Sequence, residues 1–250
     1  MTGFLIRLAG PLQSWGEHSG FSDRDTRRFP TRSGIIGILA AAEGTGRGQP
    51  LDRYDPLTLT IRVDRPGSLL RDFHTAGGGV PRERSIPTSE GKRREQGKGI
   101  VVTRRWYLSD AVFTVAVEGP ATLTGEITTA LRAPHWQPYL GRRSCPPDQP
   151  LLLRSSLDDP VGELTGSVPL PGRRTADSDR ITVELITEKP YNGAALAEVN
   201  DIPVAFGRYE RSYRARAVYR SMAQVPAELG NWPSAASYRK ALYEYAGSSR

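Results

Sequence analysis

Residues 4–39 constrain the fold most, because they contain a strand and a helix that must both be buried. Residues 4–9 form a short apolar run, broken by one arginine and ended by a Gly-Pro pair, which is typical of a buried strand. Thr31 or Ser33 can cap the helix that follows. Residues 34–42 are apolar on nearly every side, which predicts a helix packed into a core. The side chains expected in that core are Ile35, Ile36, Ile38 and Leu39.

Further apolar segments follow in an order that predicts one α+β body. The expected strands are 4–9, 57–63, 111–117 and 151–154, and the expected helices are 34–43 and 121–131. The order strand-helix-strand-strand-helix-strand is that of the ferredoxin-like (RRM-like) fold, which RNA-recognition modules use. Residues 57–63 alternate between apolar and polar, so we expect this strand to be half-buried. We predict a ferredoxin-like βαββαβ body over 1–155 and a β-rich C-terminal extension over 156–250.

The segment over residues 82–105 carries most of the chain's positive charge. It holds eight basic residues against three acidic ones, a net +5 of the +7 carried by the whole chain. Few apolar residues precede residue 100, so burial cannot offset the entropy lost on ordering the segment. It is therefore either a solvated loop or an arm that orders on a nucleic-acid backbone. The strand predicted at 100–108 is expected to form a hairpin with 111–117.

Composition excludes several classes of function. No apolar run reaches the ~18 residues of a membrane span, and the first residues lack the pattern of a signal peptide. A single cysteine, Cys145, cannot form an internal disulfide, which favours the cytoplasm. Three histidines and one cysteine lack the spacing of a structural zinc site, and phosphate-loop, nucleophile-elbow and dinucleotide motifs are missing from the sequence. We therefore expect no cofactor, no metal and no membrane contact.

Single-stranded RNA is the polyanion that best matches the aromatic and basic residues. Such RNA is held by Arg and Lys at its phosphates and by stacking of bases on exposed rings. Rings stand beside basic residues at Trp15, Phe73, Trp106, Tyr107, Trp136 and Tyr139. Most rings in any protein belong to the core, so both interpretations remain open here. The strand predicted at 213–220 has a basic face, formed by Arg214, Arg216 and Arg220, which is either solvated or a binding surface.

Five longer motifs carry a family resemblance. They are Leu8-Ala-Gly-Pro-Leu-Gln-Ser-Trp-Gly16, Arg28-Phe-Pro-Thr-Arg-Ser-Gly34, Leu70-Arg-Asp-Phe-His-Thr75, Tyr107-Leu-Ser-Asp-Ala-Val-Phe-Thr-Val-Ala116 and Pro138-Tyr-Leu-Gly-Arg-Arg-Ser-Cys-Pro146. In this order they closely resemble the CasD family, a type I-E CRISPR Cascade subunit of the RAMP superfamily. The resemblance covers residues 4–154 and is much weaker beyond about residue 155.

The resemblance implies a ferredoxin-like body with a protruding β-hairpin thumb at about 76–106. It implies a non-catalytic antiviral-defence protein that caps one end of Cascade and binds the 5′ handle of the crRNA. Its neighbours would be the backbone subunit CasC and the large subunit CasA, which reads the PAM and so links the chain indirectly to target DNA. The RNA-binding residues we predict are Gln13, Trp15, Arg24, Arg27, Arg28, Arg32, Ser33, Arg82, Arg84, Arg93, Arg104, Arg105, Arg142 and Arg143.

Two other functions remain as alternatives. The first is a metal-independent endoribonuclease that processes CRISPR repeat RNA, as relatives in type I-C systems do, with His18 or His74 acting beside Tyr107. His135 is a further candidate acid or base. The type I-E resemblance argues against this activity, because a separate subunit, CasE, cuts the RNA in that subtype. The second alternative is a purely protein-binding scaffold, which leaves the basic segment unexplained.

Overall fold

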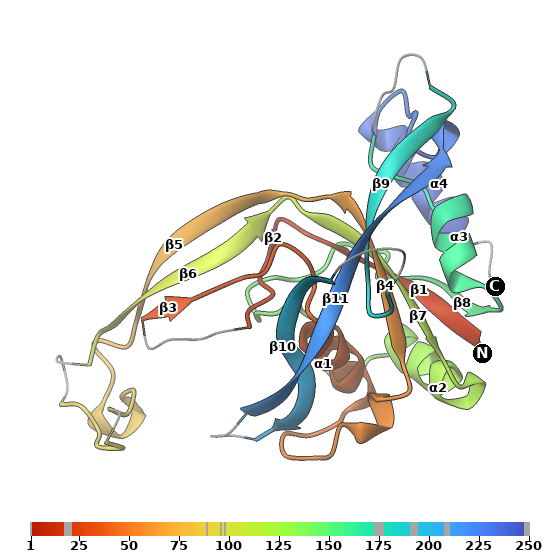
Figure 1. The fold of residues 1–250 in the computed structure, drawn as a ribbon. Helices are drawn as coiled ribbons and strands as arrows, with labels where there is room; N and C mark the ends of the chain where they lie inside the picture. The colour runs from red at the N-terminus through yellow and green to blue at the C-terminus, as the bar shows by residue number, and fades with distance from the viewer. Residues whose placement is uncertain are drawn as a thin grey trace.

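The computed structural model describes residues 2–17, 22–88, 90–95, 97, 99–172, 178–190, 195–207 and 211–247. His18 and Lys98 lie outside the described residues. Within these ranges the chain is a mixed α+β molecule, as predicted (Figure 1).

Seven strands form the main sheet, in the spatial order β10-β11-β9-β4-β7-β1-β8, and every neighbouring pair is antiparallel. Their bounds are β1 (Thr2–Ala9), β4 (Thr58–Arg65), β7 (Val112–Gly119), β8 (Leu152–Leu157), β9 (Arg180–Thr187), β10 (Ala195–Phe206) and β11 (Arg211–Pro226). The helices α1 (Arg32–Glu43) and α2 (Ala121–Arg132) complete the six elements that the sequence predicts up to residue 154. The existence and order of these six elements are confirmed.

Helices cover both faces of β1. Phe4 and Ile6 pack in one core cluster with α1 and α2, whereas Leu5 packs in a second cluster with α3 (Pro160–Gly166) and α4 (Ala235–Gly247). Figure 1 shows α2 and α3 on opposite sides of β1 and β8. A strand buried on both faces is mostly apolar, which explains the run in the sequence that only Arg7 interrupts. The predicted core residues of α1 are all buried: Ile35, Ile36, Ile38 and Leu39.

Thr60, Arg62 and Asp64 of β4 are buried, and the prediction that this strand is half-buried is wrong. Arg62 Nε donates to Asp64 Oδ1 at 2.6 Å, and Arg62 Nη1 donates to the carbonyls of Leu164 and Val168. Thr114 Oγ1 donates to Asp64 Oδ2 at 2.6 Å. Alternation places these side chains on one face correctly, but it cannot show that α3 and its neighbouring loop cover that face.

A second, smaller sheet is organised around β6 (Val101–Ser109). It pairs with β5 (Ser68–Ala76) over nine positions, and its other edge pairs with β2 (Leu12–Gln13) and β3 (Asp23–Arg24). Both edges of β6 are therefore occupied, and the predicted hairpin between 100–108 and 111–117 is wrong. Figure 1 shows β5 and β6 running together away from the main sheet. We call residues 68–109 the arm; it includes the short 3-10 helix η2 (Arg82–Arg84).

Residues after 156 extend the same main sheet. β9 pairs with β4, with Ile61 opposite Ile186, and β11 and β10 continue the sheet outward. The 3-10 helices η1 (Asp52–Tyr54) and η3 (Ala227–Leu229) lie in connections. The division into 1–155 and 156–250 stays a prediction, but the two parts share one hydrogen-bonded sheet. Within the described residues, no helix is long and apolar enough to span a bilayer.

Candidate nucleic-acid interface

Arg32 points into the protein, and the prediction that it faces a partner is wrong. Its side chain is 5% exposed. The guanidinium donates to the carbonyls of Leu57 at 3.0 Å and Tyr54 at 2.9 Å, and it contacts Glu188 Oε1 at 2.8 Å. Arginine offers five donors, so it can hold η1, the start of β4 and the end of β9 together.

Tyr54, whose backbone carbonyl accepts from Arg32, has a phenol with a shifted pKa. Burial and a hydrogen bond to Glu43 raise the pKa of Tyr54 to about 12.

The N-terminus of α1 is occupied by a carboxylate of the chain itself. Thr31 Oγ1 accepts from Gly34 N at 3.3 Å, as a cap, and the Arg32 backbone N–H donates to Asp201 Oδ2 at 2.6 Å. Asp201 is fully buried and also accepts from Arg216 Nε at 2.6 Å. A helix N-terminus attracts anions, and here the carboxylate of an internal aspartate is that anion. We predicted RNA phosphate near this turn, but the Arg32 N–H at the start of the helix already donates to Asp201.

Gln13 and Trp15 are buried, so the prediction that they face outward is also wrong. Gln13 Nε2 donates to the carbonyls of Leu8 at 3.1 Å and Ala111 at 2.8 Å. The indole Nε1 of Trp15 donates to Gln13 Oε1 at 3.0 Å, and its ring packs against Gly34. The hydrogen bonds hold the loop after β1 at the start of β7, and the Trp15 ring holds it against α1. Sequence patterns do not separate such a structural amide-indole pair from an exposed one.

The other predicted residues of this loop are partly or fully accessible. Arg28 is exposed, and Ser33 is half-buried at the edge of a cavity described below. Arg27 forms an ion pair with Glu17, and Arg24 lies in β3 beside β6. Of this group, Arg28 is exposed, whereas Arg24 and Arg27 are half-buried.

Arg142 and Arg143 lie in one tight turn but have different environments. Leu140 N donates to the carbonyl of Cys145 at 2.8 Å, and both side chains are fully buried anchors. A Cβ on Gly141, which has φ of 82°, would overlap the carbonyl oxygen of Ser14. This anchoring turns Arg142 inward over the Tyr107 ring at 4.5 Å and leaves Arg143 exposed. Arg143 therefore remains a candidate for RNA binding, whereas Arg142 holds the turn.

The arm presents cations and apolar side chains together. Arg82, Arg84, Arg93 and Arg104 are exposed, and Arg105 is half-buried with Nε donating to Thr103 Oγ1 at 3.0 Å. Phe73 is opposite Arg104 in the register and is 69% exposed. Other exposed apolar residues of the arm are Leu69, Leu70, Ile100 and Val102. A projecting pair of strands with so much exposed apolar surface has the composition of a binding element.

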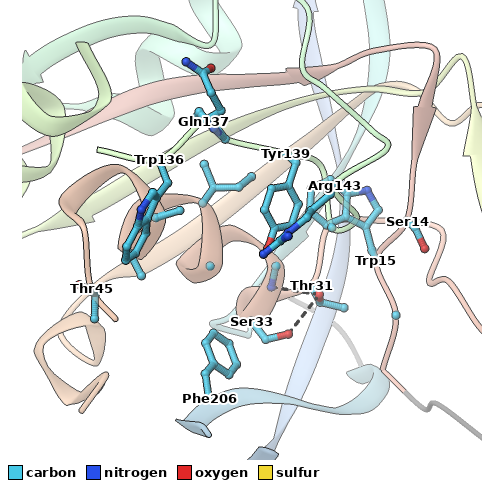
Figure 2. Close-up of a pocket in the computed structure, with 18 of the residues that line it drawn as sticks. Ser14, Trp15, Thr31, Ser33, Thr45, Trp136, Gln137, Tyr139, Arg143 and Phe206 are labelled. Atoms are coloured by element: carbon cyan, nitrogen blue, oxygen red, sulfur yellow. Dashed lines mark hydrogen bonds between the residues drawn. The ribbon is translucent and has the colours of Figure 1, made fainter. Parts of the chain in front are cut away.

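A cavity of about 1040 Å³ lies along α1, between the segment 136–149 and the ends of β10 and β11. Figure 2 shows Trp136 and Tyr139 from that segment and Phe206 from β10 around it. The backbone N–H groups of His135 and Trp136 donate to the last carbonyls of α1, at 2.9 and 3.2 Å, and so fix this wall. We call this space the α1 cavity. Its lining includes Arg143, together with residues that the sequence did not single out: Arg47, Phe206, Arg211 and Tyr213.

The groups proposed for ribonuclease chemistry do not converge among the described residues. His74 lies on β5, where Nδ1 is 3.5 Å from an oxygen of Asp72, and both side chains are half-buried. Tyr107 is buried beneath Arg142. His135 lies after α2, with its ring 4.8 Å from that of Trp136. The described residues also contain no group of three or more His, Cys, Asp or Glu side chains arranged to hold a metal ion.

Carboxylates from other segments neutralise the basic face that the sequence shows at 213–220, which lies on the long strand β11. Arg214 pairs with Asp55 at 3.1 Å, Arg216 with Asp201 at 2.6 Å, and Arg220 with Glu184 at 2.9 Å. Each of these arginines meets a carboxylate from another element. This face is held by internal ion pairs and is not a continuous cationic surface.

Comparison with known proteins places this geometry in a family. The family model described as CRISPR-associated protein (Cas_Cas5) matches residues 3–219. The Cascade subunit CasD of Escherichia coli (strain K12) is 38% identical over 185 residues, which cover 67% of this chain and 78% of CasD. A chain from a solved CRISPR RNA-guided surveillance complex is 50% identical, with a TM-score of 0.88 over 98% of this chain and 99% of that one.

A second solved structure, a crystal structure of a Cas protein, is 30% identical, with a TM-score of 0.61 over 92% of this chain and 97% of that one. The family model, over residues 3–219, spans both the arm and the α1 cavity. The motifs in the sequence, the family model and these relatives agree, and the chain belongs to the CasD/Cas5 family of CRISPR-associated proteins.

Proposed function

We propose that this chain is the subunit of a Cascade interference complex that binds and caps the 5′ handle of crRNA. The observation that carries the proposal is the match, over nearly the whole chain, to a chain of an RNA-guided surveillance complex. The exposed cations of the arm and of Arg28 and Arg143 support it, because single-stranded RNA is held by such contacts.

The body of this subunit, we infer, is ferredoxin-like, and the arm is its thumb. Support comes from the antiparallel strand order β4-β7-β1-β8 with α1 and α2 on one face, and from the nine-residue pairing of β5 with β6. In this mechanism Arg82, Arg84 and Arg104 neutralise phosphates, and Phe73 offers a ring for stacking. The thumb then lies across the RNA and fixes where the guide begins.

The subunit would contact the backbone subunit CasC and the large subunit CasA, and through them target DNA only indirectly. It would position RNA without cutting it. The burial of Tyr107 beneath Arg142 supports a non-catalytic role, because general acid-base catalysis needs its groups within hydrogen-bond reach of one 2′-OH.

The salt dependence of crRNA retention tests RNA binding by the arm. We compare the reconstituted complex containing the triple variant R82A/R84A/R104A with one containing R132A/R239A/K240A, which removes the same charge from exposed positions on α2 and α4. Each phosphate contact on a single strand contributes about 0.7 to the slope of log K against log salt. The arm variant should lose up to about 2 units of slope and release crRNA at raised salt. Equal retention by both variants would contradict the proposal.

Incubation with cognate repeat RNA tests the ribonuclease alternative. The purified wild-type chain and H74A should both leave the RNA intact. A discrete product from the wild-type chain that H74A fails to generate would replace our proposal with the enzymatic one.

A further inference from the structure

Gly37 of α1 has no explanation in the packing of the chain. Glycine inside a helix is destabilising relative to alanine, so its presence there calls for a reason. Gly34, one turn earlier, has one, because a Cβ there would lie 2.7 Å from Trp15 Cε3. A Cβ on Gly37 would meet nothing within 4 Å, and Gly37 lines the α1 cavity. The space in front of this glycine is thus left open by the protein itself.

The walls of the cavity combine flat rings with positive charge. Trp136, Tyr139 and Phe206 contribute aromatic surface, and the Phe206 ring contacts Tyr213 edge-on at 6.2 Å between centroids. Three arginines are also present: Arg47, Arg143 and Arg211. Among the described lining residues there is no aspartate or glutamate. A ligand that is flat, apolar on its faces and negatively charged elsewhere fits these walls, and a nucleotide has this chemistry.

The volume also suits a nucleotide segment. At about 1040 Å³ the cavity is slightly larger than the roughly 300–1,000 Å³ typical of ligand pockets. The cavity therefore has room for a base together with its sugar and phosphate.

We propose that the α1 cavity takes an unstacked nucleotide of the bound RNA, with its base against the helix face at Gly37 and its phosphate toward the arginines. This inference rests on the proposed function and adds the paired strands β10 and β11, called here the β10–β11 hairpin, to the RNA site. Phe206 and Arg211 are paired where β10 ends and β11 begins, and the Gly48 N–H donates to the Phe206 carbonyl at 3.2 Å. The hairpin is thereby joined to the loop that carries Arg47.

Filling the space tests the proposal directly. G37L places a side chain in the cavity from a position where the backbone is already helical. G125L is the matched control, since Gly125 is an exposed glycine of α2 whose added Cβ also meets nothing within 4 Å. The probe is a fluorescein-labelled 5′-handle RNA, measured by anisotropy with the full chain and by retention in the reconstituted complex. We expect roughly tenfold weaker binding by G37L, as for the loss of one base stack, and no change for G125L.

Two further measurements separate blocking from misfolding and locate the base. G37A should unfold at the same temperature as wild type or higher, and G37L should keep the wild-type circular dichroism spectrum. A handle RNA with 4-thiouridine at one position at a time should crosslink to Trp136, Tyr139 or Phe206 in the wild-type chain and lose this crosslink in G37L.

The outcomes distinguish the two proposals. If wild type binds RNA and G37L binds equally well with the same crosslinks, the cavity proposal is overturned while the proposed function stands. If neither the wild-type chain nor its complex retains RNA, both are overturned. If G37L retains RNA but no longer assembles with its neighbouring subunits, the cavity holds a protein segment instead, which also overturns the RNA occupant.

Discussion

Arg142 and Arg143 show how two identical neighbours acquire different roles. Arg142 Nη2 donates to the carbonyl of Arg24 at 3.2 Å while its guanidinium covers Tyr107, whereas Arg143 lines the α1 cavity. R142A should lower the free energy of unfolding by about 1–3 kcal/mol, because it removes a hydrogen bond and a desolvated cation–π contact. R143A should change it by less than about 0.5 kcal/mol.

Urea denaturation and handle-RNA anisotropy on both variants check this contrast. R143A should bind RNA more weakly than wild type despite its unchanged stability. Equal destabilisation by the two substitutions would contradict the assignment of Arg142 to the fold.

Replacing Asp201 should lower the free energy of unfolding strongly. Its carboxylate accepts from the Arg32 N–H and from Arg216 Nε and Nη2, and it is fully buried. D201N removes the charge and leaves donors unmatched, so we expect a loss of about 3 kcal/mol of unfolding free energy. D55N breaks the exposed pair with Arg214 and should cost less than about 1 kcal/mol. Thermal and urea unfolding of both variants measure the difference.

At the scale of elements, substitutions in the arm should change RNA binding without changing the stability of the fold. Phe73 is largely exposed on β5, so F73S should leave the unfolding temperature nearly unchanged. The same change should weaken handle-RNA binding by about 1–3 kcal/mol if a base stacks on the ring. The control is T75S, a smaller change two positions along the same face of β5. A loss of stability without a loss of binding would indicate that Phe73 packs within the protein.

At the scale of the whole molecule, the last third of the chain completes the first part. α3 and α4 cover Leu5, Ala116 and Leu153, and Glu188 and Asp201 are the carboxylates that meet Arg32. A chain ending at residue 157 should therefore expose apolar surface, bind a dye such as ANS and unfold without cooperativity. A variant with residues 82–95 replaced by a short Gly-Ser linker should unfold as cooperatively as wild type. Cooperative unfolding of the truncated chain would support the predicted division at 155.

Local patterns predicted most of the elements but few of their long-range contacts. Periodicity and turn residues sufficed for β1, α1, β7 and α2, because these signals are contained in a short window. The burial of Arg32, Gln13 and Trp15 depends on partners far along the chain or on exact loop geometry. A short stretch of sequence contains neither kind of information. The cavity residues Phe206 and Arg211 escaped notice for the same reason, since only the fold brings them to α1. The local clues to that cavity were Trp136, Tyr139 and Arg143, which the sequence singles out and which line it.

The carboxylate at the start of α1 also sets an order of events during synthesis. Arg32 and Asp201 are 169 positions apart, so a ribosome adding 5–20 residues per second delivers the aspartate ~8–34 s after the arginine. Throughout that interval the nascent helix has an uncompensated positive end and a core open on one side. We therefore expect the emerging chain to rely on chaperones, or on early contact with a polyanion, until its final strands leave the ribosome.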